Sequence, residues 1–354
     1  MVLLSLILIL KQGQNLTMFL IFFLYSICFA SSSESEQYLR WVETLDVVAH
    51  PEPNYRYYSE FSAQIAEKIK EKPGVISAFR AGRTVENRSI WGFRVHNPMH
   101  TPRYKILIFA GLHPLEWVGT EATVDALLEL VDHPPKYTEV VFIPLFNVDR
   151  RYVVQKDLIR GNRKYRRSNA GGEDLNREFE IHREPVSPFR YLFPNRYTVS
   201  TSPLSQPESQ ALDRLAKTEN FDASISLHSF GGYIYYPWAG RYKRTPDWKE
   251  FHELALIMKQ AQPNPRPYRV KQLSHWYFMF QVQGTELDHL YGKYGIRSFL
   301  IETTRSGVPL WNLKERKDPF RLYNPKDPSL DTLRGKASIL ALIRYYDQRL
   351  DNDQ

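Results

Sequence analysis

The sequence contains histidine and glutamate side chains at a spacing that suits a metal ion. His113 and Glu116 are three residues apart after an apolar segment, and His228 follows a second apolar segment. Imidazole nitrogen and carboxylate oxygen are good zinc ligands, and a catalytic zinc has three protein ligands and one open position. The three residues are therefore a candidate site for one zinc ion. The alternatives are a surface His113 beside a helix-capping Glu116, and a buried His228 satisfied by backbone groups.

A further acidic residue is a candidate for acid–base chemistry. Glu302 ends the apolar run at residues 296–301, and burying a carboxylate there is costly unless it is paired, hydrated or functional. If it faces the metal, Glu302 would take a proton from the attacking water and later deliver it to a leaving amine. The alternative is a salt bridge to Arg305.

Arginines supply the cationic part of the candidate site. The segment 163–167 is densely basic and includes Arg163 and Arg166, although a solvated loop is the usual interpretation of such a run. Asn176 and Arg177 are more specific, because a guanidinium binds a carboxylate in a bidentate manner and a neighbouring amide adds a donor. We expect these two residues to contact a substrate carboxylate.

The elements that must position these residues alternate between buried strands and amphipathic helices. Apolar runs predict buried strands at residues 104–110, 139–145 and 296–301, with short strands at 76–80, 89–95 and 222–227. Helices are predicted at residues 57–72, 117–131, 205–217, 247–261, 285–294 and 333–349. This order predicts an α/β fold, a single domain with a mixed, largely parallel central sheet covered by helices on both faces.

The candidate residues follow the predicted strands. In open α/β sheets, ligands bind beyond the carboxyl ends of the strands. His113, His228 and Glu302 each come at or just after the end of a different predicted strand. One segment, residues 178–207, has five prolines and no clear periodicity, and a loop of this length is usually functional or disordered. We expect it to face the substrate.

The first thirty residues predict a secretory signal peptide. Two apolar runs are present, and the second ends at Ala30 before three serines, which is typical of a signal and its cleavage site. The alternative is an uncleaved anchor, but each run is shorter than the roughly 20 residues that a spanning helix needs. Met18 is a second possible start. The expected organisation is a signal at 1–30, a short extension at 31–54 and a catalytic domain at 55–354.

Composition excludes several classes of protein. The chain has 354 residues with 43% hydrophobic and 24% charged residues, which indicates a globular protein. Its single cysteine, Cys28, lies in the expected signal, so neither a disulfide-stapled fold nor a zinc site with several thiolates is possible. The net charge of +8 is not gathered in a basic tail or a nucleic-acid motif, so we expect no nucleic-acid partner. A basic surface could instead attract anionic substrates.

Taken together, these residues resemble the zinc metallocarboxypeptidases, the family of pancreatic-type carboxypeptidases and their bacterial relatives. The resemblance covers about residues 55–305 and depends on an ordered set of motifs at residues 82–90, 111–118, 147–149, 174–179, 226–230, 236–237 and 299–302. Each motif alone is weak, whereas the ordered set is specific. The resemblance implies the same kind of mixed α/β sheet.

The resemblance also implies catalytic roles. His113, Glu116 and His228 would bind zinc, and Glu302 would be the general base and acid. Arg166 would polarise the scissile carbonyl and stabilise the oxyanion.

The substrate-binding residues follow in the same way. Asn176 and Arg177, with Arg163 nearby, would hold the terminal carboxylate of the substrate, which would make the enzyme an exopeptidase. The chain departs from the family at Phe280, which stands where a substrate-contacting tyrosine is usual. The position that reads the terminal side chain is Leu287, which suggests a preference for apolar or aromatic C-terminal residues.

The sequence thus predicts a secreted or periplasmic, monomeric zinc metallocarboxypeptidase. Its partners would be peptide or protein C-termini, with no stable membrane insertion after the signal is removed. The alternatives are a zinc-dependent deacylase of acylated amino acids, an amidase on cell-wall peptides, or a non-catalytic binding protein on the same scaffold.

Overall fold

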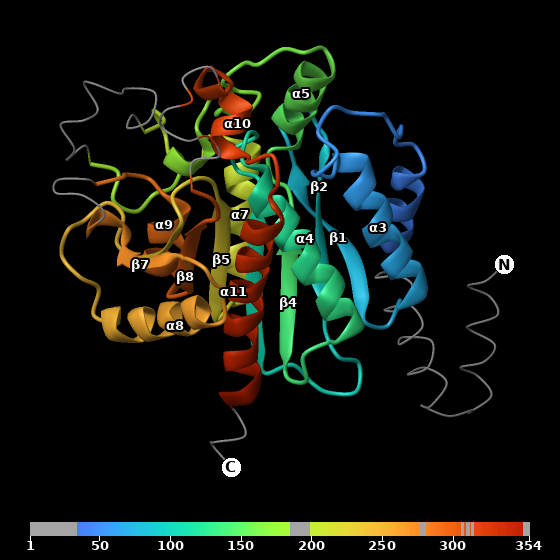
Figure 1. Cartoon of the computed structure of the whole chain (residues 1–354). Helices are drawn as coiled ribbons and strands as arrows, with labels where there is room; N and C mark the ends of the chain where they lie inside the picture. The colour runs from blue at the N-terminus through green and yellow to red at the C-terminus, as the bar shows by residue number, and fades with distance from the viewer. Residues whose placement is uncertain are drawn as a thin grey trace, which may run out of the picture.

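An eight-stranded sheet forms the centre of the molecule. The computed structural model describes residues 34–184, 199–275, 281–305, 308, 312 and 315–349. The strands lie in the order β1-β2-β4-β3-β5-β8-β6-β7, with helices on both faces (Figure 1). The four central strands β4, β3, β5 and β8 are mutually parallel, and antiparallel pairs flank them. The predicted mixed, largely parallel sheet is confirmed.

The strand bounds explain the apolar runs of the sequence. The strands are β1 (Ile76–Arg83), β2 (Ser89–Val95), β3 (Tyr104–Ala110), β4 (Thr138–Ile143), β5 (Ala223–His228), β6 (Tyr233–Tyr236), β7 (Arg269–Gln272) and β8 (Arg297–Glu302). Residues 106–110 of β3 are all buried and all apolar. A parallel strand covered on both faces must be apolar on both sides, so its sequence is nearly continuous rather than alternating.

The helices divide between the two faces of the sheet. They are α3 (Tyr58–Glu71), α4 (Trp117–Asp132), α5 (Val148–Ile159), α7 (Pro207–Glu219), α8 (Trp248–Gln260), α9 (Glu286–Tyr294), α10 (Pro319–Tyr323) and α11 (Ser329–Gln348). Short 3-10 turns are η1 (Leu175–Arg177), η3 (Leu273–His275) and η4 (Glu315–Lys317). Helices α3, α4, α8 and α11 cover one face, and α7 and α9 cover the other (Figure 1).

Strand β3 shows how one sequence serves both layers. Its side chains alternate across the sheet, so Ile106 and Ile108 join the core under α3, α4, α8 and α11. Leu107 and Phe109 join the core under α7 and α9. Both faces of the sheet are thus occupied by apolar cores. Polar groups can gather instead at the carboxyl ends of the strands.

The carboxyl ends of β3, β5 and β8 bring the candidate residues to one edge. Strand β3 ends at Ala110, and Gly111 turns the chain with φ of +71°. A Cβ at Gly111 would lie 2.6 Å from Leu145 Cδ1, so glycine is required by both the space and the backbone conformation. On the neighbouring strands, His228 of β5 pairs directly with Glu302 of β8.

Several short elements were not predicted from the sequence. Helices α5 and α10 and the four-residue strands β6 and β7 carry too few residues, or too polar a pattern, to stand out from their surroundings. The expected substrate-facing loop at 178–207 includes residues 185–198, which lie outside the described residues. The structure therefore does not test that expectation.

The segment before α3 packs onto the sheet. Residues 34–42 are helical, and Tyr38 is 1% exposed with its ring edge-on to Trp91 and Phe93 at centroid distances of 5.2 and 5.0 Å. The predicted signal at 1–30 lies outside the described residues. Within the part of the chain that the structure describes, no helix combines the length and apolarity that a membrane crossing requires.

Candidate active site

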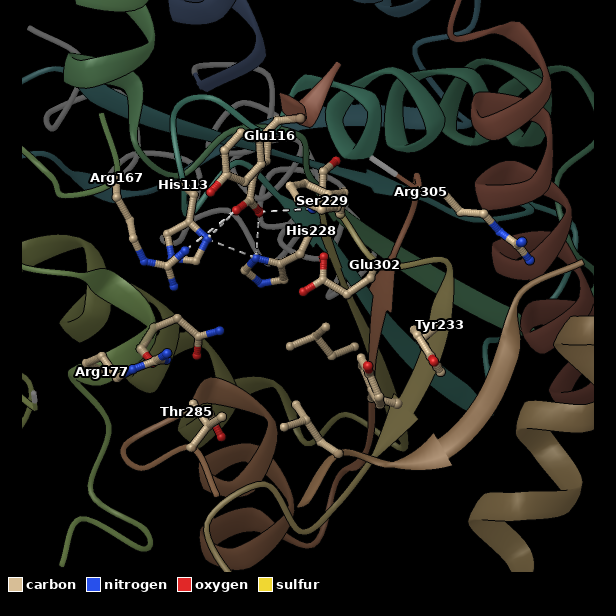
Figure 2. Close-up of a pocket in the computed structure, with 18 residues that line it drawn as sticks. His113, Glu116, Arg167, Arg177, His228, Ser229, Tyr233, Thr285, Glu302 and Arg305 are labelled. Atoms are coloured by element: carbon tan, nitrogen blue, oxygen red, sulfur yellow. Dashed lines mark hydrogen bonds and ion pairs between the residues drawn. The ribbon is translucent and has the colours of Figure 1, made fainter. Parts of the chain in front are cut away.

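Three side chains converge on one point at the carboxyl edge of the sheet. His113 Nδ1 lies 2.9 Å from Glu116 Oε1, and His228 Nδ1 lies 2.9 Å from Glu116 Oε2. The two Nδ1 atoms are 3.2 Å apart. All three residues are buried, and their ligand atoms lie within 4.8 Å of one another (Figure 2). We call His113, Glu116 and His228 the triad.

Local backbone structure aims these side chains. His113 follows the glycine turn after β3, Glu116 stands at the N-cap of α4, and His228 is the last residue of β5. The backbone N–H of Ser229 donates to Glu116 Oε2 at 3.1 Å, which fixes the carboxylate between the two imidazoles. Residues 112 positions apart in sequence therefore meet because β3 and β5 are parallel neighbours.

Each triad histidine contacts a second carboxylate through its other ring nitrogen. His113 Nε2 lies 2.9 Å from Asp174 Oδ1, and His228 Nε2 lies 3.1 Å from Glu286 Oε1. Hydrogen bonds of this kind fix the ring orientation and leave Nδ1 as the free lone pair. Both imidazoles therefore present Nδ1 to the same point.

The donor set of the triad fits a divalent cation such as zinc. Two nitrogen lone pairs and a carboxylate facing one another repel unless a positive charge lies between them. Burial opposes the charged imidazolium, but hydrogen bonds to Glu116 and Glu286 outweigh it and raise the pKa of His228 to about 10. Burial likewise opposes ionisation of Glu116, whereas the charges of both histidines hold its pKa well below the usual value. The triad thus attracts positive charge, and its two nitrogens and carboxylate are suitable zinc ligands.

Glu302 lies beside the triad without a partner of its own. Its Oε2 atom is buried and makes no hydrogen bond within the described residues. Burial, and then the charge of Glu116, raises the pKa of Glu302 to about 7. Figure 2 shows its carboxylate next to His228, with Arg305 pointing away from it, and no ion pair joins Glu302 to Arg305 in the described chain. The salt-bridge alternative for Glu302 is therefore not observed.

The structure places Arg167, not Arg166, at the cavity. Arg166 Nε pairs with Asp157 Oδ2 at 2.6 Å and does not line the cavity. Arg167 lines it, and its Nε atom contacts Asp174 Oδ2 at 2.6 Å. The expectation for Arg166 is thus corrected by one position, because adjacent residues of an extended segment point in opposite directions and only one can face inward.

Burial and charge define the electrostatics around Arg167. Burial disfavours its charged form, but the charges of Asp174 and Glu116 outweigh this and raise its pKa. Asp174 is affected reciprocally, because Arg167 and His113 hold its pKa well below the usual value against the cost of burial. Arg167 Nη1 is 3.8 Å from Glu116 Oε1, so a fixed cation stands next to the triad.

Asn176 and Arg177 line the same cavity, whereas Arg163 does not. Asn176 and Arg177 come from η1, where the Asp174 side chain accepts from the Asn176 backbone N–H at 3.0 Å. Arg163 is directed elsewhere, with its Nε atom 2.9 Å from Asp318 Oδ2. Of the three residues expected to hold a carboxylate, the structure brings two to the site.

The far wall of the cavity is apolar. The cavity has a volume of about 530 Å³. Apart from the polar residues above, its lining includes Tyr233, Tyr235, Leu273, Val282, Thr285 and Leu300. Leu287 is 1% exposed and packs in the cluster formed by Tyr235, Leu273, Val282 and Leu300, without itself lining the cavity. Phe280 lies outside the described residues.

Other residues at the site escaped the sequence analysis. Arg167 belongs to a basic run in which several positions were equivalent. Tyr233 and Tyr235 lie on the short strand β6, and Tyr323 lies on the short helix α10. Glu286 is fully buried at the start of α9, where an acidic residue in the first helical turn is usual and attracts no notice.

Comparisons with known proteins place this site in context. A family model described as zinc carboxypeptidase matches residues 62–317. Carboxypeptidase O of Bos taurus is 24% identical over 220 residues, covering 58% of this chain and 56% of that protein. Carboxypeptidase A2 of Mus musculus is 25% identical over 277 residues, covering 72% of this chain and 63% of that protein. The chain thus spans less than two thirds of the length of these curated relatives.

A solved structure has the same fold. The structure of bovine thrombin-activatable fibrinolysis inhibitor in complex with tick carboxypeptidase inhibitor matches with a TM-score of 0.66 at 20% identity. The match covers 84% of this chain and 98% of that chain. At this identity the likeness concerns the fold, and the site must be judged by its own geometry.

Proposed function

Because the chain belongs to the zinc carboxypeptidase family, we propose that it is a zinc-dependent metallocarboxypeptidase that hydrolyses the last peptide bond of its substrates. The observation that carries this proposal is one cavity lined by the triad, by Glu302 and by the pair Asn176 and Arg177. A metal site, an acid–base group and a carboxylate-binding pair are the parts that an exopeptidase of this kind needs.

The triad would hold one zinc ion through the Nδ1 atoms of His113 and His228 and the carboxylate of Glu116. Zinc at this position would act as a Lewis acid on the scissile carbonyl and lower the pKa of a water molecule. The remaining chemistry belongs to side chains of the protein. The triad supports this assignment because it supplies all three protein ligands that a catalytic zinc site needs.

Glu302 is the proposed general base and acid. Its buried Oε2 atom has no hydrogen-bond partner in the described chain, so it is available to accept a proton from the attacking water. A carboxyl group with a pKa raised toward 7 is well suited to accept that proton and then to donate it to the leaving amine.

Arg167 is the proposed electrophilic residue. Its guanidinium lines the cavity beside Glu116 and is oriented by Asp174. A fixed positive charge in a buried site stabilises the oxyanion that develops as the carbonyl is attacked. The sequence predicts this role for Arg166, but the Arg166 guanidinium forms an ion pair with Asp157.

Asn176 and Arg177 are the proposed binding site for the terminal carboxylate of the substrate. Guanidinium and amide groups offer the donors that a carboxylate needs. Both side chains are buried, with exposed fractions of 5% and 6%, so water competes weakly for these hydrogen bonds. The requirement for a free C-terminus would follow from this pair.

The apolar wall supports a preference for apolar or aromatic C-terminal residues. Leu273, Val282 and Leu300 line the cavity together with Tyr235. Leu287 packs behind them and would define the wall without touching the substrate. A charged terminal side chain would lose hydration there without gaining a partner among these residues.

The proposed organisation places the catalytic domain at residues 55–354, preceded by a signal peptide at 1–30. The support for the signal is the apolar run that ends at Ala30 before three serines. The proposed location is therefore outside the cytoplasm, and the proposed partners are peptide or protein C-termini. We propose that the enzyme acts as a monomer.

A substrate series tests the proposed function. The zinc-loaded enzyme is given an N-blocked dipeptide ending in Phe, the same peptide as its C-terminal amide, and peptides ending in Lys or Glu. We expect release of Phe from the free acid, little release from Lys and Glu peptides, and none from the amide. Release of an acyl group from an N-acyl amino acid, with no peptide hydrolysis, would indicate the deacylase instead. Stoichiometric zinc without any hydrolysis would indicate a binding protein.

A further inference from the structure

The two histidines of the triad are supported by carboxylates of different origin. Asp174 contacts His113 from the η1 region and is shared with Arg167. Glu286 contacts His228 from the first turn of α9 and has no contact with Arg167 among the described residues. We propose that Glu286 is a positioning residue that fixes His228 for metal binding, which rests on the function proposed above.

The contacts of Glu286 are directed at β5. Its Oε1 atom lies 3.1 Å from His228 Nε2 and accepts from the hydroxyl of Ser226 at 2.8 Å. Ser226 and His228 are alternate residues of the same strand and therefore project to the same face. The Oε1 atom of Glu286 therefore contacts His228 while a hydrogen bond from Ser226, on the same strand, holds that oxygen in place.

The burial of Glu286 argues against an incidental contact. The residue has no exposed surface, and its Oε2 atom makes no hydrogen bond within the described residues. A buried carboxylate with an unsatisfied oxygen is costly unless a nearby positive charge compensates for it. No lysine or arginine forms an ion pair with Glu286 in the described chain, and its one charged partner is His228. The compensating positive charge must therefore come through His228, either as the protonated ring or as a cation bound to it.

The proposed effect follows from the two nitrogens of the ring. A histidine that binds a metal through Nδ1 must carry its proton on Nε2, and an ionised acceptor at Nε2 favours that tautomer. The same acceptor fixes the ring plane and increases the basicity of Nδ1. Loss of a supporting partner of this kind typically weakens metal binding by about 10- to 100-fold.

Glu286 also links the metal site to the substrate site. Its backbone N–H donates to Asn176 Oδ1 at 3.1 Å, which leaves the amide nitrogen of Asn176 for the cavity. One residue therefore orients a triad histidine through its side chain and the carboxylate-binding amide through its backbone. Glu286→Gln removes the negative charge from the first contact and preserves the second.

Zinc affinity of the full chain tests the proposal. Wild type, Glu286→Gln, Asp174→Asn and Glu208→Gln are titrated with zinc against a competing chelator. Glu208 is the matched control, because it is an equally buried glutamate that contacts Asn169 and none of the triad. We expect Glu286→Gln to weaken zinc binding about 10- to 100-fold, as Asp174→Asn does, and Glu208→Gln to change it less than about twofold.

Two further measurements separate positioning from general destabilisation. The unfolding temperature of each metal-free variant is measured, and Glu286→Gln is expected to melt close to wild type because the amide keeps the size of the carboxylate. The visible spectrum of the cobalt-substituted protein is expected to shift in Glu286→Gln but not in Glu208→Gln, since it reports the geometry of the ligands. If Glu286→Gln does not fold, Glu286→Asp, which withdraws the carboxylate by one methylene, is used in its place.

The outcomes are distinct. Zinc affinity and cobalt spectrum in Glu286→Gln equal to wild type, while Asp174→Asn loses affinity, would overturn the inference and leave the proposed function intact. No zinc binding by the wild-type chain would overturn the proposed function itself. Equal losses in Glu286→Gln and Glu208→Gln would assign the effect to burial of any carboxylate and also overturn the inference.

Discussion

Two clusters of the described chain gather three histidine and carboxylate side chains around one point, and they differ in the source of positive charge. In the triad, His113, Glu116 and His228 face one another with no lysine among them. In the second cluster, Glu180, Asp213 and His289 meet between α7 and α9.

In the second cluster a lysine already pairs with both carboxylates. Lys293 Nζ lies 2.6 Å from Glu180 Oε2 and 3.0 Å from Asp213 Oδ1. His289 contacts Asp213 Oδ1 at 2.8 Å, and burial lowers the pKa of this histidine. The same residue types therefore form an ion-pair network in one place and the proposed metal site in the other. Histidine and carboxylate side chains therefore favour a metal ion where no lysine ammonium bridges them, and Arg167 approaches the triad only at Glu116 Oε1, at 3.8 Å.

Removing one histidine from each cluster is the strongest way to break this comparison. We expect His228→Ala to abolish stoichiometric zinc binding and activity, because a catalytic site needs three protein ligands. His289→Ala should retain one zinc per chain and near-normal activity. Elemental analysis and the dipeptide assay measure both. Loss of zinc from His289→Ala with retention in His228→Ala would reverse the assignment of the two clusters.

The next largest effect is expected from replacing Glu302, the proposed general base beside the triad. Glu302→Gln should lower kcat by about 10²- to 10⁴-fold, the usual contribution of a general acid–base group. Its zinc content should remain unchanged, because Glu302 is not one of the three proposed ligands. Turnover close to wild type would exclude Glu302 as the base.

Neighbouring arginines provide a matched pair for the cationic group. Arg167→Ala should lower kcat/KM by about 10²- to 10³-fold, since a donor to a developing oxyanion is lost. Arg166→Ala should change it by less than about threefold, because Arg166 pairs with Asp157 away from the cavity. Zinc content is measured in both, given that Arg167 also contacts Asp174. The opposite ranking would restore the original expectation for Arg166.

The pH dependence of kcat/KM in the wild type tests how burial beside the triad affects Glu302. Burial and Glu116 raise the pKa of Glu302 to about 7. Below its pKa Glu302 is protonated and cannot act as a base, so kcat/KM should fall about tenfold per pH unit on the acid side. A dication at the triad favours the carboxylate and moves this limb to lower pH. An acid limb that stays at the same pH in the residual activity of Glu302→Gln would contradict the assignment.

The smallest effect is expected when the lysine of the second cluster is removed. Lys293→Met should lower the free energy of unfolding by about 1 kcal/mol, because a partly exposed ion-pair network stabilises the fold only modestly. Peptidase activity and zinc binding at the triad should be unaffected. Chemical denaturation and the dipeptide assay measure this. A loss of activity would show that the second cluster contributes to the site after all.

The sequence predicted the strands and the site residues at their ends with different success. The run at residues 104–110 coincides with β3, because a strand buried on both faces is continuously apolar. Strands β6 and β7, with four residues each, carry no such signal, yet β6 supplies Tyr233 and Tyr235 to the cavity. Such short strands are held by their neighbours in the sheet rather than by their own sequence pattern, which explains why they were not predicted.

The basic segment at 163–167 shows a second limit. The sequence indicated that an arginine from it would serve the site, and it favoured Arg166. Only the fold decides which of two adjacent side chains faces inward, and Asp157 and Asp174 divide the two arginines between them. Arg163 is likewise drawn away by Asp318, which is 155 residues distant in the sequence.

The sequence by itself determined the chemistry that is possible. With a single cysteine at position 28, it restricted metal ligands to histidine and carboxylate, and the order of its motifs indicated the family. Tertiary structure decided which charged groups meet. Pairing of β5 with β8 sets His228 beside Glu302, and the start of α9 brings Glu286 against His228. Composition and spacing limit what a side chain can do. Its charged partners, near or far in the sequence, decide what it does, because electrostatic interactions act through space and not along the chain.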